Sequence, residues 1–331
     1  MSMFGWHRAS GGHRAVLGCA FVLALSAPDL MASQTVWTID GNLDSDESAE
    51  ISGLRCIAGA SHPTCLMVAD ETRFARRMEL NGSTLIVGGK VDLLPPSAKK
   101  EADAEAVDID EGFYYVTGSH GLSKSGNHQS TRYFVFRIAI APNTGAPGKV
   151  EASDRLLAAI QGIPELKDFV DRRIEAGDKP LEHGLNIEGL AVRDGQAYFG
   201  LRGPVRDGTA FVVKTPVQAL FGSGPTAAEL LPVKLGQGIG IRDMAKVEGG
   251  MLLLTGPEAE TPGHAAVFFW DGHGTAPKHL ADLNLAESEE AKPEALLVLA
   301  EQADAYRALV LSDSAVNGEP REYRVPKPAG M

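Results

Sequence analysis

Short apolar runs bounded by turn residues recur along the chain. The clearest is Glu188–Val192, which leads over Asp194 and Gly195 into a second run, Ala197–Leu201. Short, turn-bounded runs rich in Val, Leu, Tyr and Phe are typical of β-strands. Four further segments, called anchors together with Glu188–Val192, begin with an acidic or small polar residue and continue as an apolar run: Ser52–Cys56, Glu105–Ile109, Asp243–Val247 and Glu294–Val298.

The spacing of the five anchors predicts the architecture. Each anchor is followed by a second and a third apolar run, and four of the five by a weaker fourth run. A period of about 50 residues with four strands per unit is typical of a β-propeller. We therefore expect an all-β fold, a single β-propeller of five four-stranded blades with one short helical insertion. The alternative is six blades, for which the sequence shows no sixth unit.

The two ends of the repeat region predict how the ring closes. The fifth unit stops after its third run, at Val325, and Gln34–Ile39 offers an unassigned strand at the other end. Pairing this segment with the last blade would complete that blade and cover an open sheet edge.

The long interval between the second and third anchors contains the insertion, residues 154–177. Pro164 suits a first helical position and Gly177 suits a helix end. Apolar residues between them have helical spacing: Leu166, Phe169, Val170 and Ile174. Residues 154–160 fit either a helical turn or the end of an outer strand. The insertion joins an outer to an inner strand, so it should lie on the face where inner strands begin, where it could act as a lid.

The N-terminus resembles a signal peptide. A weakly basic head precedes the apolar run Ala15–Ala27, which is too short to cross a bilayer, and small residues follow at Ala32 and Ser33. We expect residues 1–32 to be removed and residues 33–331 to form the propeller domain, exported to a periplasm or secreted. Acylation of Cys19 is the alternative. No later stretch is long enough for a transmembrane helix.

The net charge limits the kinds of partner the chain can bind, and the cysteine content predicts a disulfide. The formal net charge of -12 opposes binding of nucleic acid and provides no basic patch for anionic lipid, whereas cations are easily accommodated. Without Cys19, the exported chain keeps Cys56 and Cys65, which face each other across a predicted hairpin. We expect them to form a disulfide, the alternative being two buried thiols.

The strand directions predict a site at one mouth of the ring. Inner strands begin on this face, which brings together an acidic ring of Glu105, Glu188, Asp243 and Glu294. Second strands end on the same face and add further polar residues: Asp70, Glu71, Ser119, His120, Arg202 and Asp313. Two carboxylates about 7 Å apart repel each other by roughly 2 kcal/mol at an effective dielectric constant near 20. Bound cations, arginines or protonation would relieve this repulsion, and Arg202, Arg242 and Arg55 are the internal countercharges. Alternatively, the acids only cap backbone N–H groups.

Two families resemble this chain. Asn186–Ala191 together with Gly200–Pro204 resembles the bacterial domain of unknown function 3616 family, and the resemblance extends from about Glu50 to Val325. The repeated anchor is also similar to the esterase-like phytase propellers. That second resemblance implies a calcium-dependent hydrolase of esters or phosphoesters, although the phosphate-binding Lys and Arg clusters of that group are missing from this sequence.

Three functional hypotheses follow. The first is an exported propeller that binds a small molecule or a divalent cation at the acidic ring, with Arg202 and His120 contacting the ligand. The second is a metal-dependent, phytase-like hydrolase of phosphoesters, esters or lactones. In it the ring carboxylates hold Ca²⁺ or another divalent ion, Arg202 orients the substrate, and His120 or Glu188 is the base. The third is a protein-interaction platform.

Overall fold

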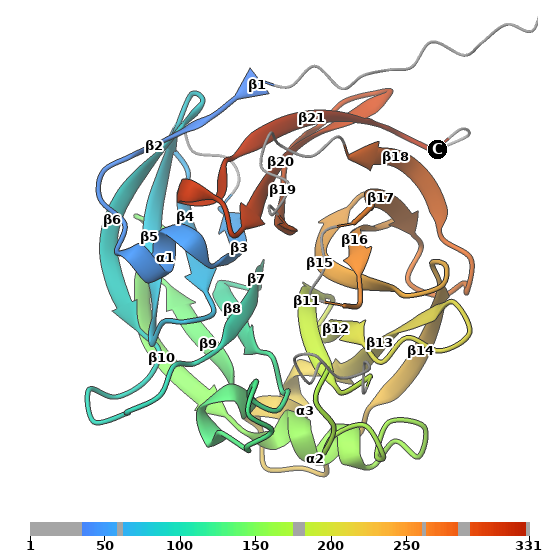
Figure 1. Ribbon diagram of the computed structural model, residues 1–331. Helices are drawn as coiled ribbons and strands as arrows, with labels where there is room; N and C mark the ends of the chain where they lie inside the picture. Colours follow the sequence, from blue (N-terminus) through green and yellow to red (C-terminus); the bar gives the residue numbers. More distant parts are fainter. Residues whose placement is uncertain (1–34, 58–61, 175–182, 260–262, 284–291, 329–331) are drawn as a thin grey trace, which may run out of the picture. The chain divides into compact units, whose positions relative to one another are not determined.

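The computed structural model describes residues 35–57, 62–174, 183–259, 263–283 and 292–328. The predicted signal peptide, residues 1–32, lies outside them. The described strands form five sheets set around a common axis (Figure 1). This arrangement is a five-bladed β-propeller, which confirms the predicted fold.

Each blade contains four antiparallel strands, the first of which lies nearest the axis, and blade 1 gains a fifth, parallel strand from the N-terminal segment. Blade 1 contains β3 (Ile51–Cys56), β4 (Thr64–Ala69), β5 (Phe74–Asn81) and β6 (Thr84–Asp92). Blade 2 contains β7 (Ala104–Asp110), β8 (Phe113–Gly118), β9 (Val135–Ile140) and β10 (Pro147–Ser153). Blade 3 contains β11 (Asn186–Arg193), β12 (Gln196–Gly203), β13 (Thr209–Pro216) and β14 (Glu229–Lys234). Blade 4 contains β15 (Ile239–Val247), β16 (Gly250–Pro257), β17 (Ala265–Trp270) and β18 (Lys278–Leu283). Blade 5 contains β19 (Lys292–Glu301), β20 (Ala305–Asp313), β21 (Arg321–Pro326) and β1 (Thr35–Val36).

Short helices occupy the connections between these strands. They are α1 (Ser45–Ala49), α2 (Arg155–Gln161), α3 (Val217–Phe221) and the 3₁₀ helices η1 (Ser130–Tyr133) and η2 (Val316–Gly318). None of the helices in the described ranges is long and apolar enough to span a membrane.

The N-terminal segment joins the first and last blades. Strand β1 pairs antiparallel with β21 of blade 5, whereas β2 (Thr38–Asp40) pairs parallel with β6 of blade 1. Between them Trp37 is buried, and its Nε1–H donates to Oε2 of Glu322 at 3.1 Å. The predicted closure by blade 5 is confirmed for β1. It is wrong for Thr38 and Ile39, because the chain passes from one blade to the next at Trp37; Gln34 lies outside the described residues.

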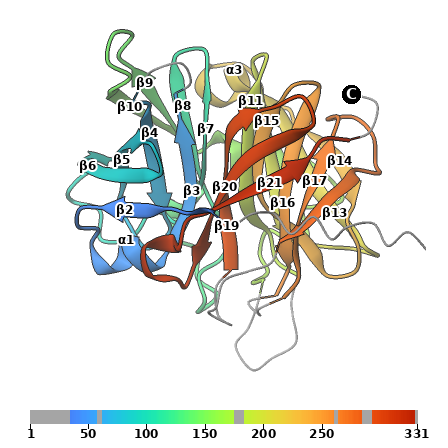
Figure 2. The same cartoon turned by 90° about the horizontal axis from the view of Figure 1, so that it is seen from above.

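The apolar core is divided among the blade interfaces. Five clusters of buried apolar side chains lie between successive blades, and the inner strands of neighbouring blades contact one another around the ring. Seen from the side, β3, β7 and β19 run roughly along the axis (Figure 2). Little room remains where they converge. A Cβ on Gly189 of β11 would lie 2.8 Å from Cγ of Met244 in the neighbouring blade.

Within its described residues, the insertion is helical only at its start. Helix α2 covers Arg155–Gln161, whereas residues 164–171 form successive turns with hydrogen bonds such as Phe169 N–H to Leu166 O, 2.9 Å. The helix predicted from Pro164 is therefore wrong, because i→i+3 hydrogen bonds replace the helical ones there; Gly177 lies outside the described residues. Leu166 and Val170 pack with α2 into the cluster between blades 2 and 3. The described part of the insertion is mainly a wedge between blades.

The predicted disulfide is confirmed. Cys56 and Cys65 are paired in register across β3 and β4, with Cα atoms 3.9 Å apart, and their sulfur atoms are bonded.

Candidate functional site

All five inner strands carry a β-bulge at the same level. In β11, Ile187 pairs with Leu201 and Gly189 with Gly200, so Glu188 between them has no partner residue on β12. Such a bulge leaves one extra residue out of the ladder and redirects its side chain. The extra residues of the five inner strands are Ser52, Glu105, Glu188, Arg242 and Glu294.

The fourth blade differs from the prediction by one residue. In β15 the bulged residue is Arg242, while Asp243 pairs with Leu254. Asp243 is fully buried and accepts a hydrogen bond from Arg55. The predicted ring of four acids is therefore wrong at Asp243, because the bulge shifts the register of this anchor by one position. Three acids, one arginine and one serine occupy the equivalent positions.

Three of the bulged residues, Glu105, Glu188 and Glu294, line a cavity of about 380 Å³, which we call the acidic pocket. Among the described residues that line it, eight are carboxylates: Glu50, Asp70, Glu71, Asp103, Glu105, Glu188, Glu294 and Asp313. Five are basic: Lys124, Arg132, Arg173, Arg202 and Lys292. The structure thus brings together the predicted residues Glu105, Glu188, Glu294 and Arg202.

A second row of lining residues was missed by the sequence analysis. Glu50, Asp103, Asn186 and Lys292 each precede a bulged residue by two positions, and all four line the pocket. Alternate residues of a strand face the same side, so this row was available as a polar residue two places before the anchor in four units.

One half of the acidic pocket consists of paired charges. Nη1 of Arg202 lies 2.6 Å from Oε1 of Glu188, and both side chains are buried. Arg242 is also buried, and its Nη1 lies 3.0 Å from Oε2 of Glu188 and 2.8 Å from Oε1 of Glu294. Burial and the charge of Glu188 hold the pKa of Glu294 well above its ordinary value, although Arg242 opposes this shift. The two arginines fix the orientations of both carboxylates.

The other half contains carboxylates without a partner. Neither Glu105 nor Asp70 makes a side-chain hydrogen bond or ion pair within the part of the chain that the structure describes, and Oδ1 of Asp70 is buried. Burial raises the pKa of both carboxyl groups well above the ordinary range, and neighbouring acids, first among them Asp103, raise it further. Ionisation of both acids is therefore less favourable than that of an exposed carboxyl group, and a nearby positive group would offset this.

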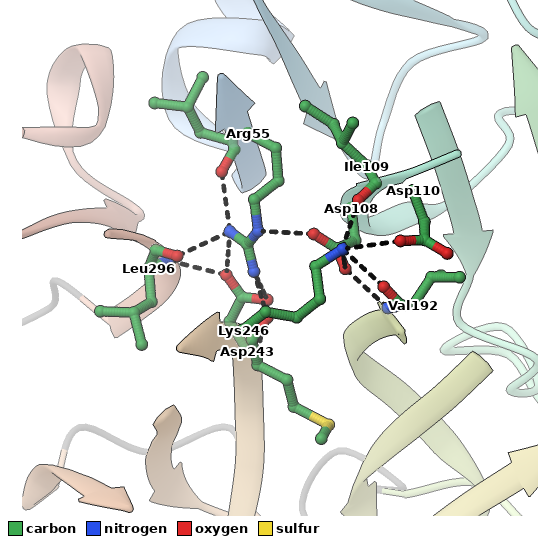
Figure 3. A network of polar contacts seen from close by, with 10 residues as sticks. Arg55, Asp108, Ile109, Asp110, Val192, Asp243, Lys246 and Leu296 are labelled. Carbon is green, nitrogen blue, oxygen red and sulfur yellow. Dashed lines mark hydrogen bonds and ion pairs between the residues drawn. The ribbon is translucent and has the colours of Figure 1, made fainter. Parts of the chain in front are cut away.

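Beneath the pocket, a second set of charges crosses the axis (Figure 3). We call Arg55, Asp108, Asp243 and Lys246 the axial network. Two nitrogens of Arg55 each lie 3.1 Å from an oxygen of Asp243, and Nζ of Lys246 lies 3.3 Å from Oδ2 of Asp108. These residues follow the bulges by one to four positions along β3, β7 and β15, so they lie farther from the mouth.

The axial network also uses backbone carbonyls of the remaining blades. Arg55 donates to the carbonyl of Leu296 in β19 at 2.6 Å, and Lys246 donates to that of Val192 in β11 at 2.6 Å. All five blades are thereby connected across the axis (Figure 3).

His120, a predicted ligand contact, does not line the acidic pocket. It is fully buried, with Nδ1 3.0 Å from the carbonyl of Gly118 and its ring edge-on to Tyr133. Burial lowers its pKa to about 4. The chain turns at His120, which has a φ of 55°, and this turn directs the side chain inward. The strand-end position was recognised from the sequence, but the side-chain direction was not.

Among the described residues no three His, Cys, Asp or Glu side chains are arranged to hold a metal ion. Calcium binding by Glu105, Glu188 and Glu294 stays a prediction. Arg202 and Arg242 already occupy much of the coordinating capacity of Glu188.

The raised pKa of Asp103 predicts that the stability of the fold depends on pH. Burial raises its pKa to about 6, although Arg132, 2.9 Å away, opposes the shift. Between its ordinary pKa, near 3.8, and 6 the folded protein holds a proton that the unfolded chain has lost. The stability that this proton provides is fully present below pH 3.8, the ordinary pKa, and is lost as the pH rises through about 6, the pKa in the folded protein. Asp103→Asn should remove it.

The measurement is urea unfolding of wild type and Asp103→Asn between pH 4 and 7. The free energy of unfolding of the variant, relative to wild type, should rise by on the order of 2 kcal/mol over this range. Glu229→Gln, on the exposed outer strand β14, is the control and should show no such trend. A constant difference between Asp103→Asn and wild type would contradict the shifted pKa.

Comparisons with solved structures find similarities at low sequence identity. One is exo-β-1,3-galactanase from Phanerochaete chrysosporium, with 12% identity over 90% of this chain and 65% of the other, and a TM-score of 0.48. The chain thus spans slightly less than two thirds of that enzyme. Another is glutaminyl cyclase from Myxococcus xanthus, with 10% identity over 88% of this chain and 97% of the other, and a TM-score of 0.43.

A comparison with curated proteins finds no match. A family model described as protein of unknown function (DUF3616) matches residues 143–325, from the outer part of blade 2 to β21 in blade 5. Because this match covers more than half of the sequence, the chain belongs to the DUF3616 family.

Proposed function

We propose that the acidic pocket binds a small organic cation, with its ammonium group placed between Glu105 and Asp70. The observation that carries this proposal is the pair of unpartnered carboxylates in the pocket. Ionising them without a partner is unfavourable because of burial and mutual repulsion. A bound ammonium group would offset both effects, because it would donate a charge-assisted hydrogen bond to each carboxylate.

The paired half of the pocket suits the rest of such a ligand. Because Arg202 and Arg242 hold Glu188 and Glu294 in fixed orientations, these carboxylates are preorganised acceptors for ligand hydroxyl or amino groups. A volume of about 380 Å³ is within the range of small-molecule sites. The organic cation is favoured over a divalent metal because no three acidic side chains in the described ranges have a metal-binding arrangement.

Binding should be coupled to proton release. Glu105 and Asp70, with raised pKa values, must lose protons to pair with an ammonium group. Affinity should therefore increase as pH rises from 5 to 8.

The test is isothermal titration calorimetry of the full chain with 1,4-diaminobutane, with the uncharged 1,4-butanediol as its matched control and CaCl₂ as the competing cation. We expect the diamine to bind and the diol not to bind. Glu105→Gln should weaken diamine binding by about tenfold or more, as expected for a lost charge-assisted hydrogen bond. Glu229→Gln should leave the affinity unchanged.

The outcomes separate the hypotheses. Binding of CaCl₂ without diamine binding would favour the divalent-cation site instead. Equal affinity of wild type and Glu105→Gln for the diamine would reject the proposed contact. The hydrolase and interaction-platform hypotheses stay predictions.

Export also belongs to the proposal. The Cys56–Cys65 disulfide supports it, because such bonds persist in oxidising compartments such as a periplasm or the extracellular space.

A further inference from the structure

A second cavity, of about 610 Å³, lies between the turns of the insertion and the loop after β12. We call it the outer groove; it is lined in part by Phe169, Arg172, His183 and Arg206. We propose that the outer groove binds a small phosphate-bearing molecule through the guanidinium groups of Arg172 and Arg206 and the Nε2 atom of His183. This site goes beyond the proposed cation site and does not depend on it.

His183 is held on one side by a buried carboxylate. Its Nδ1 lies 3.0 and 2.9 Å from the two oxygens of Glu258, whose side chain is 1% exposed. The N–H of Val205 also donates to Glu258, at 2.9 Å, which fixes the carboxylate. Nδ1–H of His183 therefore donates to Glu258, while Nε2 makes no hydrogen bond within the described ranges. The His183 side chain is 46% exposed in the groove, so Nε2 is accessible, and when it also carries a proton it can donate to a phosphate oxygen.

The backbone around His183 is constrained to this arrangement. His183 has a φ of 54°, in the left-handed region, and it is followed by Gly184. A Cβ on Gly184 would lie 2.0 Å from the carbonyl oxygen of Arg172, so only glycine allows the loop to approach the insertion this closely. Backbone conformations of this kind persist where surrounding packing enforces them, and they are frequent at binding sites.

Two arginines provide the positive charge. The guanidinium groups of Arg172 and Arg206 lie 5.0 and 5.6 Å from the centre of the Phe169 ring. Neither forms an ion pair or hydrogen bond within the residues that the structure describes. Stacking on an aromatic ring leaves the N–H edges of a guanidinium group free, and two such edges match the oxygens of a phosphate.

Three exposed acids restrict the ligand. Glu165, Asp168 and Asp207 also line the outer groove, so a large anion would be repelled. A small phosphate monoester that carries an ammonium group matches both signs of charge. O-phosphoethanolamine is the probe of this type, and inorganic phosphate tests the anionic part alone.

The experiment is ¹⁵N NMR of the imidazole groups in the full chain, with His183 signals identified from their loss in His183→Gln. We expect both probes to shift the Nε2 resonance of His183 to saturation, with O-phosphoethanolamine binding more tightly. Arg206→Gln should weaken binding by about tenfold. Arg193→Gln, at a partly exposed arginine of β11 outside the groove, should leave it unchanged.

Three results would overturn the proposal. The first is a His183 resonance that does not change even at a high phosphate concentration. The others are equal weakening of binding by Arg193→Gln and Arg206→Gln, and binding of ethanolamine alone as tightly as its phosphate ester. Arg206 is exposed, so Arg206→Gln should keep the wild-type melting temperature, which separates lost binding from lost folding. Glu105→Gln should not change phosphate binding, whatever its effect on the acidic pocket.

Discussion

Replacing Arg55 by methionine should lower the free energy of unfolding by about 3–5 kcal/mol, the cost expected when one partner of a buried ion pair is removed. Arg55 is buried, and it pairs through two nitrogens with the fully buried Asp243. It also donates to carbonyls of blades 1 and 5, at Leu54 and Leu296. Methionine would fill a similar volume but leave Asp243 without its countercharge. Urea unfolding at pH 8 measures the effect.

Two comparisons test the mechanism. Arg55→Lys keeps the positive charge but loses the two-nitrogen contact with Asp243, so it should be less destabilising than Arg55→Met. Lowering the pH towards 5 should reduce the deficit of Arg55→Met, because Asp243, whose pKa burial already raises to about 6, can then be neutralised. Arg193→Met, at a partly exposed arginine, is the control. A loss below about 1 kcal/mol, typical of surface ion pairs, would show that the axial network does not hold the ring together.

The ring could be predicted because its information is local and repeated. Each blade shows its strands as apolar runs between turns, and the predicted run Ala197–Leu201 lies within β12. Closure was harder to predict in detail. A sequence shows that the segment around Trp37 is a strand, but not that its two ends pair with different blades.

The acidic pocket was only partly predictable, for a reason visible in blade 4. Both Arg242 and Asp243 are polar, and the sequence pattern alone favours the acid as the first residue of the anchor. The bulge instead leaves Arg242 out of the ladder and turns Asp243 towards Arg55. A bulge is defined by its partner strand, so its position within an inner strand is not a property of that strand's own residues.

The axial network was anticipated only in Arg55, which was expected to be a countercharge of the acidic ring. Asp243 pairs with Arg55, which is 188 positions away in the sequence. Periodicity predicts which side of a strand a residue faces, but it does not predict which of several charged neighbours a long side chain will contact across the axis.

Replacing Arg242 by methionine is the second change with a large expected effect. Arg242 is the shared countercharge of Glu188 and Glu294, at 3.0 and 2.8 Å, and it is 2% exposed. Its loss leaves two buried carboxylates facing each other, with Arg202 remaining on Glu188 alone. We expect the free energy of unfolding at pH 8 to fall by about 3–5 kcal/mol.

The sign of the pH dependence separates this explanation from a general packing defect. The pKa of Glu294 is already raised by burial and by Glu188, and removing Arg242 should raise it further. The destabilisation should therefore shrink as the pH falls and Glu294 takes up a proton. The double variant Arg242→Met, Glu294→Gln should recover part of the loss at pH 8, because it removes the unpaired charge. A deficit that is the same at pH 5 and pH 8, and that the second substitution does not reduce, would mean that Arg242 acts through packing rather than charge.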